Sequence, residues 1–296
     1  MTQSQKTFAI FGNTYNHHKE MPVAQIIQFL HTRGQRVIID RPLFDYLVST
    51  TQIGIGFTDA DTFADDHFHA DYAISIGGDG TFLKSAMRVA TKGIPLLGIN
   101  MGRLGFLADV LPSETTEALD AVLNGNYNIE DHTAIEIHTD GGTIDGCRYA
   151  LNDIAVLKRD VASMISIRTS IDDSFLVNYQ ADGLIVTTPT GSTAYSLSNG
   201  GPIIVPQTNT LCLTPVAPHS LNVRPIVISD QSVVRLEVES RSHNYLVAVD
   251  GRSYTMHEGS VVTIKKAPFK AHIVKPNGRR YFSSLREKMM WGADKR

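Results

Sequence analysis

The sequence predicts two domains: an α/β domain built on a doubly wound, mostly parallel sheet, and a β-rich domain with antiparallel strands. In the first 125 residues, short apolar runs typical of buried strands alternate with stretches of helical spacing. From about residue 126, apolar and polar residues alternate with a period of two, and turns rich in Gly, Asp, Asn and Ser separate the strands. We therefore expect domains at 1–125 and 126–280, with a C-terminal helix at 281–296 that packs back on the first domain.

Strands and helices alternate along the first domain. Strands are expected at 7–13, 36–40, 71–76 and 94–100. Helices are expected at 22–34, 81–92 and 112–125. The strand at 71–76 is apolar nearly throughout, as a strand covered on both faces should be. This βαβ order is typical of a parallel sheet.

Local signals mark the ends of two of these helices. The first has Pro22 in its first turn and Gly34 as its stop, and the last has Ser113 as its N-cap and Gly125 as its stop. One face of the first helix is apolar. It carries Val23, Ile26, Ile27 and Leu30.

The second domain has the pattern of short strands with one apolar face. Alternation is clearest at Ile135 and Ile137, and at Val234, Leu236 and Val238, where a polar residue separates neighbouring apolar ones. Similar runs occur in MISIRTSI, FLVNYQADGLIVTT, YLVAVDG, SVVTIKK and AHIVKP. Such strands favour an antiparallel sandwich or layered sheets.

Composition excludes several classes of protein. The chain has 296 residues, 42% hydrophobic and 19% charged, with a net charge of −3, which is globular and offers no basic footprint for nucleic acid. The N-terminus lacks the apolar core of a signal peptide, and no apolar stretch approaches the roughly 20 residues of a membrane span. The only cysteines, Cys147 and Cys212, have no metal-ligand spacing and suit a reducing cytoplasm. We expect a soluble cytoplasmic protein that binds neither membrane nor nucleic acid.

The stretch IGGDGT places three glycines and an acid where a buried strand meets a helix. In an open α/β sheet, ligands bind at the carboxyl ends of the strands, and Gly77, Gly78 and Gly80 would let the backbone approach a phosphate. Asp79 can act there as a general base on an attacking hydroxyl, with a divalent metal offsetting the repulsion between carboxylate and phosphate. The alternative is a tight turn in which Asp79 caps the next helix.

A second glycine-rich loop, GINMGRLGFLAD at 98–109, also follows a strand. It adjoins the first loop if the strands at 71–76 and 94–100 are neighbours through one right-handed crossover. Glycine-rich strand ends are common, so this loop supports a site only together with the first.

Two polar segments of the second domain are candidates for ligand contacts. Asn152 and Asp153 form an amide–carboxylate pair that can bind an adenine edge or ribose hydroxyls, or can form an ordinary turn. The segment 180–204 is rich in hydroxyl side chains and turn formers. It is either a long structureless surface loop or a loop that binds a polar ligand, with Tyr195 against a base.

Six segments occur in the order and spacing found in NAD kinases, a family that this sequence resembles. They are GGDGTFL, GINMGRLGFLAD, LNDIAV, ADGLIVTTPTGSTAYSLSNGGPII, TPVAPHSLNVRPIVI and VAVDGR. The resemblance covers nearly all of residues 72–252. The resemblance implies an α/β N-terminal domain joined to a β-rich C-terminal domain, which agrees with the periodicity.

The resemblance also implies a reaction. NAD kinases transfer the γ-phosphate of ATP, or in some members of polyphosphate, to the 2′-hydroxyl of the adenosine ribose of NAD⁺, giving NADP⁺. The metal is usually Mg²⁺, which accompanies ATP, and no metal site of the protein itself is expected. NAD and ATP are then the substrates, bound between the domains. The family forms dimers or tetramers, which implies a homo-oligomer.

Site residues carry over where this sequence matches the family's motifs. Asp79 matches the proposed base, and Gly77, Gly78 and Gly80 match the phosphate seat. The expected NAD contacts are Asp79, Gly80, Lys84, Asn152, Asp153, Ser163, Gln180, Asp182, Thr190, Thr193, Ala194, Tyr195, Ser196, Leu197, Ser198 and Arg252.

This sequence departs from the family's pattern at two positions. Asp153 stands where glutamate is frequent, and Arg252 stands where some members have glutamine. A long basic residue at 252 can meet a phosphate or merely face solvent. Ser163 and Gln180 match contacts that vary within the family.

Two other functions remain open from the sequence. A lipid kinase of the diacylglycerol or sphingosine type shares GGDGT, but the TAYSLS segment and the lack of an amphipathic membrane-binding segment stand against it. A module that binds the dinucleotide without turnover would need no acid at the phosphate seat. His17 and His18, like His67 and His69, are expected to be loop residues rather than catalysts or metal ligands.

Overall fold

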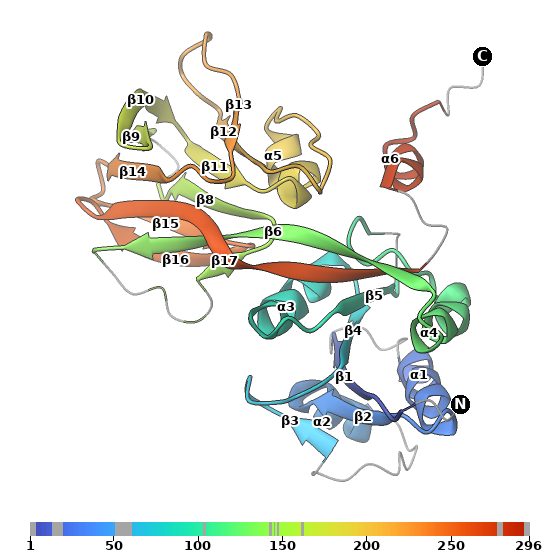
Figure 1. The fold of residues 1–296 in the computed structure, drawn as a ribbon. Coiled ribbons are helices and arrows are strands. Elements are labelled where there is room, and N and C mark those ends of the chain that lie inside the picture. Colours follow the sequence, from blue (N-terminus) through green and yellow to red (C-terminus); the bar gives the residue numbers. More distant parts are fainter. Residues whose placement is uncertain are drawn as a thin grey trace. The chain divides into compact units, whose positions relative to one another are not determined.

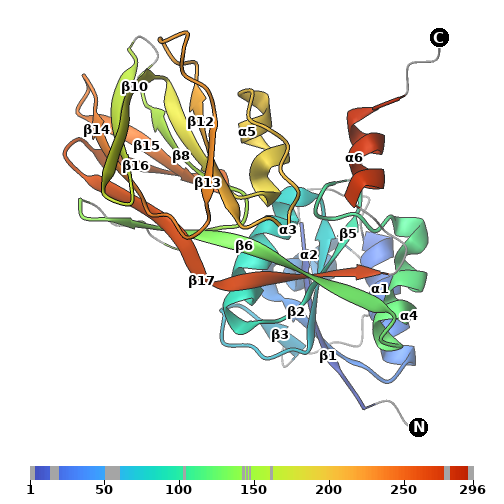
Figure 2. The same cartoon turned by 45° about the horizontal axis from the view of Figure 1, so that its top comes forward.

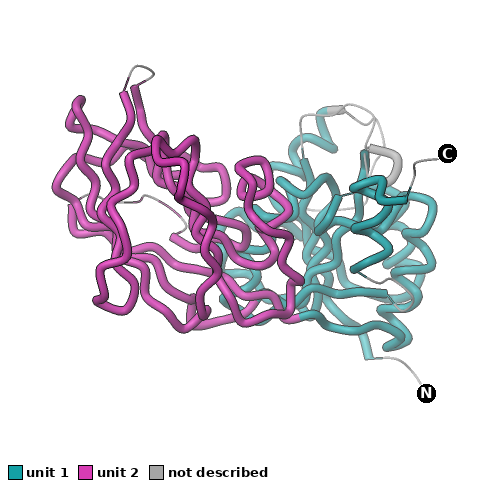
Figure 3. Tube along the Cα trace, turned by 90° about the horizontal axis from the view of Figure 1, so that it is seen from above, with its two compact units in different colours: residues 1–130, 271–296 teal, residues 131–270 magenta. Residues whose placement is uncertain are grey.

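The computed structural model describes residues 4–13, 20–50, 61–102, 105–141, 144, 146, 148–160, 163–276 and 281–292, without the side chains of 20–22 and 50. It divides the chain into two compact units, residues 1–130 with 271–296, and residues 131–270 (Figure 3). Both divisions fall inside long strands, β6 (Tyr127–Thr139) and β17 (Val261–Pro276). His17, His18 and Cys147 lie outside the described residues.

Unit 1 has the predicted α/β architecture (Figure 1). Besides the ends of β6 and β17, its elements are β1 (Thr7–Gly12), α1 (Glu20–Thr32), β2 (Arg36–Asp40), α2 (Arg41–Thr50), β3 (Thr62–Phe63), β4 (Tyr72–Gly77), α3 (Asp79–Val89), η2 (Ala90–Lys92), β5 (Leu96–Asn100), η3 (Pro112–Glu114), α4 (Thr115–Leu123) and α6 (Tyr281–Met289). The strands pair in the order β3-β2-β1-β4-β5-β17, and each of these pairs is parallel. Figures 1 and 2 show α1 and α4 together on one face of this sheet and α3 on the other.

The strand order of unit 1 reverses between β1 and β4. From β1 the chain moves outward to β2 and β3, and it then returns to β4 on the other side of β1. Ligands of open α/β sheets bind at the carboxyl ends of the strands where the order reverses. Because β4 ends at Gly77 and α3 begins at Asp79, the GGDG loop lies at this switch point.

Helix α2 and strand β3 were not predicted. Leu43 and Leu47 are buried at a spacing of four residues, and Arg41 pairs with Asp45 at 2.9 Å, so the helical signal was present but short. It was missed because α2 follows β2 without an intervening turn residue.

The predicted N-cap at Ser113 is wrong. The chain enters a 3₁₀ turn at Pro112, and Ser113 lies inside that turn. The side chain of Glu114 instead accepts a hydrogen bond from the backbone N–H of Leu111 at 3.0 Å. The predicted stop is confirmed, because Gly125 adopts a left-handed φ of 73° just after α4.

Unit 2 consists of two antiparallel sheets. Besides β6 and β17, its elements are β7 (Tyr149–Ala150), β8 (Asp153–Lys158), β9 (Ile165–Ile171), β10 (Ser174–Ala181), β11 (Gly183–Thr187), η4 (Thr190–Thr193), α5 (Tyr195–Ser198), β12 (Thr210–Val216), β13 (Ile226–Ser229), β14 (Val234–Glu239), β15 (Asn244–Val249) and β16 (Arg252–His257). One sheet contains β10-β9-β14-β17, with β6 pairing β17 and β7, and the other has the order β13-β12-β11-β8-β15-β16.

The inner faces of the two sheets form one apolar core. Ile135, Ile137, Val234, Leu236 and Val238 are all buried in it, which confirms the predicted period of two. The run FLVNYQADGLIVTT contains two strands, β10 and β11, and the runs VVTIKK and AHIVKP belong to the single strand β17. In the described part of the chain, no helix has the length and apolar character of a membrane span.

Candidate active site

Asp79 is the first residue of α3, and its carboxylate is held by the loop that follows β5. Its Oδ2 accepts a hydrogen bond from the backbone N–H of Phe106 at 2.8 Å. Its Oδ1 accepts from Leu107 and Ala108 at 3.0 and 3.1 Å. The residue in the N-cap position is Gly78, so the reading of Asp79 as a helix cap is wrong. Three backbone donors therefore fix the position of this carboxylate.

The two glycine-rich loops adjoin, as predicted from the order of their strands. β4 and β5 are parallel neighbours with Gly77 opposite Asn100, and the backbone N–H of Met101 donates to Gly77 O at 3.2 Å. The Asn100 side chain donates to Ala108 O at 3.1 Å and accepts from the N–H of Gly102 at 2.6 Å. Asn100 thus fixes the shape of the loop whose backbone amides bind the Asp79 carboxylate.

Packing explains some of the glycines in these two loops but not the others. A Cβ on Gly77 would lie 2.4 Å from Thr81 Oγ1, and one on Gly105 would lie 2.0 Å from Asp79 Oδ1, so packing excludes a side chain at both. At Gly78 and Gly80 a Cβ would meet no atom within 4 Å, and neither residue has a positive φ. Neither packing nor conformation explains these two glycines, and each leaves the backbone open to close approach by a ligand.

Lys84 lies further along α3, with an exposed side chain. It follows Gly80 by four residues, which places it one helical turn further on and on the same side of the helix. An exposed ammonium on this flexible stem can reach an anion near the start of α3.

In unit 2, Asp250 holds the Asn152–Asp153 pair. Asp250 and Gly251 form the two-residue turn between β15 and β16, and both have positive φ, 45° and 78°, as in a type I′ hairpin. The Asp250 carboxylate accepts hydrogen bonds from the backbone N–H groups of Leu151, Asn152 and Asp153 at 2.8, 2.9 and 3.1 Å. The start of β8 is therefore clamped by a side chain from another hairpin.

Burial perturbs both carboxyl groups of this arrangement. It raises the pKa of Asp153 to about 7, and the neighbouring charge of Asp250 adds to the rise. Burial also raises the pKa of Asp250, against the three N–H donors and the charge of Arg252, which lower it. Because the donors favour an ionised Asp250, we assign the proton to Asp153. The Oδ1 of Asn152 is buried without a hydrogen-bond partner among the described residues, so its lone pairs are unused there.

The hydroxyl-rich segment after β11 is more ordered than expected. It contains η4 and α5, and two of its hydroxyls serve the fold. Ser192 Oγ donates to Pro189 O at 2.6 Å and accepts from the N–H of Ile204 at 2.9 Å. Ser196 Oγ lies 2.8 Å from Thr214 Oγ1, and its side chain is fully buried.

Other residues of this segment are more accessible. Tyr195 and Ser198 are exposed. Thr193, Ala194 and Leu197 are partly exposed. Thr190 is buried, and its hydroxyl lies 2.7 Å from His132 Nδ1 on β6. The residues that the structure leaves open to a ligand are therefore fewer than the run of hydroxyls suggests.

The remaining predicted contacts of unit 2 fall into two places. Ser163 and Gln180 line one cavity of about 530 Å³, together with Glu239, Arg241 and Glu258 among others. Asp182, between β10 and β11, pairs with Lys158 at 2.7 Å.

The sequence left two alternatives for Arg252, contact with a phosphate or exposure to solvent. In the structure its side chain is half-buried. Its Nε donates to Val249 O at 3.4 Å, and its Nη2 donates to Tyr149 O at 3.5 Å. Because both are long bonds to backbone carbonyls, the guanidinium keeps donors for another acceptor.

The family models of ATP-NAD kinases match both halves of the chain, the N-terminal domain at residues 8–127 and the C-terminal domain at residues 151–276. The NAD kinase of Bacteroides fragilis is 52% identical over 289 residues, which cover 98% of this chain and 99% of that protein. This chain belongs to the NAD kinase family. The NAD kinase of Porphyromonas gingivalis is 41% identical over 97% of this chain and 99% of its own length.

Two solved structures resemble the fold of this NAD kinase family member. A crystal structure of yeast NADH kinase complexed with NADH has a TM-score of 0.87 at 22% identity, covering 99% of this chain and 89% of that one. A NAD kinase from Archaeoglobus fulgidus in complex with ATP has a TM-score of 0.74 at 26% identity, covering 96% and 98%. The comparisons do not favour the lipid kinase alternative.

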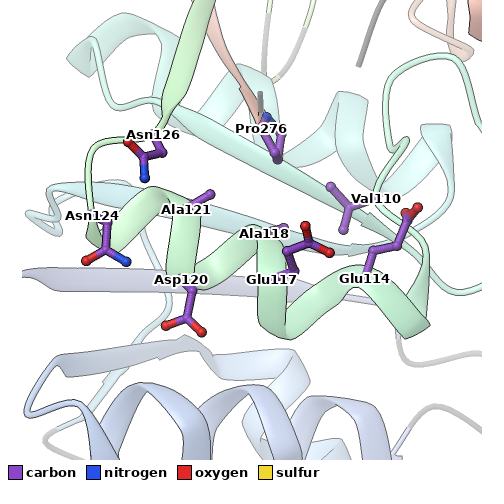
Figure 4. A pocket seen from close by; sticks show the side chains of 9 residues that line it. All are labelled: Val110, Glu114, Glu117, Ala118, Asp120, Ala121, Asn124, Asn126 and Pro276. Carbon is purple, nitrogen blue, oxygen red and sulfur yellow. The ribbon is translucent and has the colours of Figure 1, made fainter. Parts of the chain in front are cut away.

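A cavity of about 540 Å³ along α4 does not suit the anionic substrates of NAD kinases. Figure 4 shows the carboxylates of Glu114, Glu117 and Asp120 around it. These groups would repel phosphates. Two of them also serve the fold, since Glu114 accepts the N–H of Leu111 and Asp120 pairs with Arg33 at 2.5 Å.

His67 and His69 are exposed beside β3, as expected. They border a cavity of about 450 Å³. Across the described ranges, no group of three or more His, Cys, Asp or Glu side chains is placed to hold a metal ion.

Sequence reasoning passed over three residues that position the predicted NAD kinase site. Phe106 gives no signal, because it acts through its backbone. His132 reads as one polar residue of an alternating strand. Asp250 was detectable as a turn, since Asp-Gly between two alternating runs predicts a hairpin, but its contact with Asn152 depends on the sheet.

Proposed function

We propose that this chain transfers the γ-phosphate of ATP to the 2′-hydroxyl of the adenosine ribose of NAD⁺, giving NADP⁺ and ADP, with Asp79 as the general base. The observation that carries this proposal is the setting of Asp79. Its carboxylate is fixed by three backbone amides beside Gly78 and Gly80, two glycines that neither packing nor conformation requires.

The chemistry follows from these groups. The ribose oxygen attacks the γ-phosphorus in line, the new P–O bond forms as the bond to ADP breaks, and the hydroxyl proton passes to Asp79. A carboxylate has about four lone-pair sites, and the three backbone donors leave room for the hydroxyl. The open backbone at Gly78 and Gly80, at the N-terminus of α3, would face the phosphates.

Unit 2 would supply the dinucleotide contacts. The unsatisfied Oδ1 of Asn152 can accept a hydrogen bond from an adenine amino group or a ribose hydroxyl, and Asp153 can donate or accept according to its proton. Tyr195 offers an exposed ring to a base. Lys84, Ser163, Gln180, Asp182 and Arg252, with the segment from Thr190 to Ser198, complete the proposed NAD contacts.

We propose that Mg²⁺ enters on the phosphates of ATP. Mg²⁺ is usually bound by substrate phosphates with one or two carboxylates, rather than by an all-protein cage. The donor set here fits this, because the carboxylate beside the phosphate seat is single and already accepts three N–H groups. When bound, the ion would neutralise charge on the triphosphate.

We also propose a cytoplasmic homo-oligomer, a dimer or tetramer. The two-cysteine composition suits a reducing compartment. Phe175 and Leu176 on β10 and Val227 on β13 expose apolar side chains, and both strands end a sheet in the described strand order. Light scattering behind a sizing column would give the mass, and a monomer at micromolar concentration would contradict this proposal.

A coupled assay tests the proposed reaction. The protein is incubated with ATP, Mg²⁺ and NAD⁺, and an NADP-specific dehydrogenase reports product. Parallel reactions replace ATP with polyphosphate under the same readout, and others replace NAD⁺ with NADH, diacylglycerol or sphingosine and are followed by release of ADP. NADP⁺ that appears only with a phosphoryl donor supports the proposal. Tight NAD⁺ binding without transfer would favour the binding module instead.

A further inference from the structure

Lys288 on α6 contacts the loop that holds Asp79. Its Nζ lies 3.8 Å from the centroid of the Phe106 ring, within the range of a cation–π interaction. The Nζ is shielded from solvent and has no hydrogen-bond partner among the described residues. An ammonium with three unused donors is unusual in such a place and calls for an explanation.

The contact matters because of what the Phe106 backbone does. Its N–H donates to Asp79 Oδ2 at 2.8 Å, and the next two amides donate to Oδ1. The far end of the same loop is anchored by another cation from the C-terminal segment, since Lys275 Nζ lies 2.7 Å from Asp109 Oδ2. Residues of β17 and α6 therefore contact this loop at two points, Asp109 and Phe106, on either side of the amides of Leu107 and Ala108.

Several charges face the Lys288 ammonium. Burial lowers its pKa to about 8, and the positive charge of Lys275 acts in the same direction. The negative charges of Asp79, Asp109 and Glu287 oppose this fall. The side chain is thus largely charged at pH 7 and neutral in moderately alkaline solution, where a cation–π contact is lost.

We propose that Lys288 is a positioning residue for phosphoryl transfer, which acts through Phe106 to hold the loop whose backbone amides fix Asp79. The inference rests on the proposed role of Asp79 as the base. It assigns α6, which lies beyond the residues that the two family models match, to the catalytic apparatus. It also explains why an ammonium is kept where desolvation disfavours it.

The first test compares K288M, K288R and wild type in the full-length protein, with R286M as the control because Arg286 is exposed on the same helix. We expect K288M to lower kcat about tenfold while KM for ATP and NAD⁺ stays within about twofold, and K288R to restore most of kcat. Since Met removes an unsatisfied buried charge, the Tm of K288M should not fall. An unchanged kcat, or a KM for ATP raised tenfold at constant kcat, overturns the proposal.

The pH dependence gives a second readout that a merely structural role would not produce. Wild-type kcat should decline above about pH 8. K288R should lose this decline because its guanidinium stays charged, and K288M should be low and flat. If the decline in kcat persists in K288R, a group other than Lys288 causes it, and the proposal is overturned.

A double-mutant cycle keeps the test valid if K288M folds poorly. F106L removes the ring but keeps the backbone amide, so it should lower kcat about as much as K288M, and the double variant should lose little more. Additive losses overturn the proposal. If wild type is active and D79N is not, a normal kcat in F106L or K288M overturns only the role of Lys288. An active D79N overturns instead the proposal that Asp79 is the general base.

Discussion

The Oδ2 of Asp79 lies 2.8 Å from the backbone nitrogen of Phe106, and this hydrogen bond joins the loop after β4 to the loop after β5. Parallel pairing of β4 and β5 places the two loops at one edge of the sheet. The edge lies at the switch point of the strand order, so the fold presents an immobilised carboxylate where α/β sheets bind ligands.

Replacing Asp79 with asparagine should abolish most turnover. An amide cannot take the ribose proton, so we expect kcat to fall about 10²- to 10⁴-fold, the usual contribution of a general base. The coupled NADP⁺ assay measures this, with thermal unfolding to confirm the fold. D173N, in an exposed turn where Asn tolerates the φ of 63°, is the matched control and should behave as wild type. Activity of D79N above a tenth of wild type would remove Asp79 from the base role.

Alanine at Gly80 should separate stability from activity. A Cβ there meets no atom within 4 Å, and alanine favours a helix over glycine by up to about 1 kcal/mol, so stability should hold or rise. The methyl group should obstruct the phosphates and raise KM for ATP at least about tenfold. G93A is the opposite control, because its φ of 67° should cost stability without changing KM. A normal KM in G80A would argue against the phosphate seat.

Asparagine at Asp250 should loosen the Asn152–Asp153 pair. Three N–H groups would lose an ionised acceptor, at a cost of about 1.5–3 kcal/mol in the free energy of unfolding. Misplacing the pair should raise KM for NAD⁺ about tenfold or more. Substrate titrations and urea unfolding measure the two effects, with the exposed D160N as control. Loss of stability with unchanged KM would show that the pair does not contact NAD⁺.

The raised pKa of Asp153 predicts a pH-dependent stability. The folded protein holds this proton up to about pH 7, while the unfolded chain releases it near the ordinary aspartate pKa of 3.8. The group's stabilising contribution is therefore fully present below that lower value and is lost as pH rises through 7. D153N should gain stability relative to wild type, by on the order of 2 kcal/mol, between about pH 5 and pH 8.5. If the urea midpoints of wild type and D153N changed with pH in the same way, the raised pKa of Asp153 would be contradicted.

Much of the fold could be predicted because its signals are local. The buried run at 72–77 and the alternation at 234–239 each needed only a few neighbouring residues. Helix α2 was not predicted, because it is short and follows β2 without a turn between them. The single strand β17 was read as two runs, since tertiary pairing carries it past Pro268.

Two features of the site can be predicted from adjacent residues alone. One is an acid among glycines after a buried strand, and the other is an amide–carboxylate pair at the start of a second strand, because strand patterns and glycine chemistry are local properties. The contacts of those acids depend instead on how distant parts of the chain pack together. The donor that holds Asp79 lies 27 residues away, and the acceptor that holds Asn152 lies 98 residues away. Burial, which sets the proton on Asp153, likewise exists only after the sheets have packed, and no local pattern encodes contacts made across that distance.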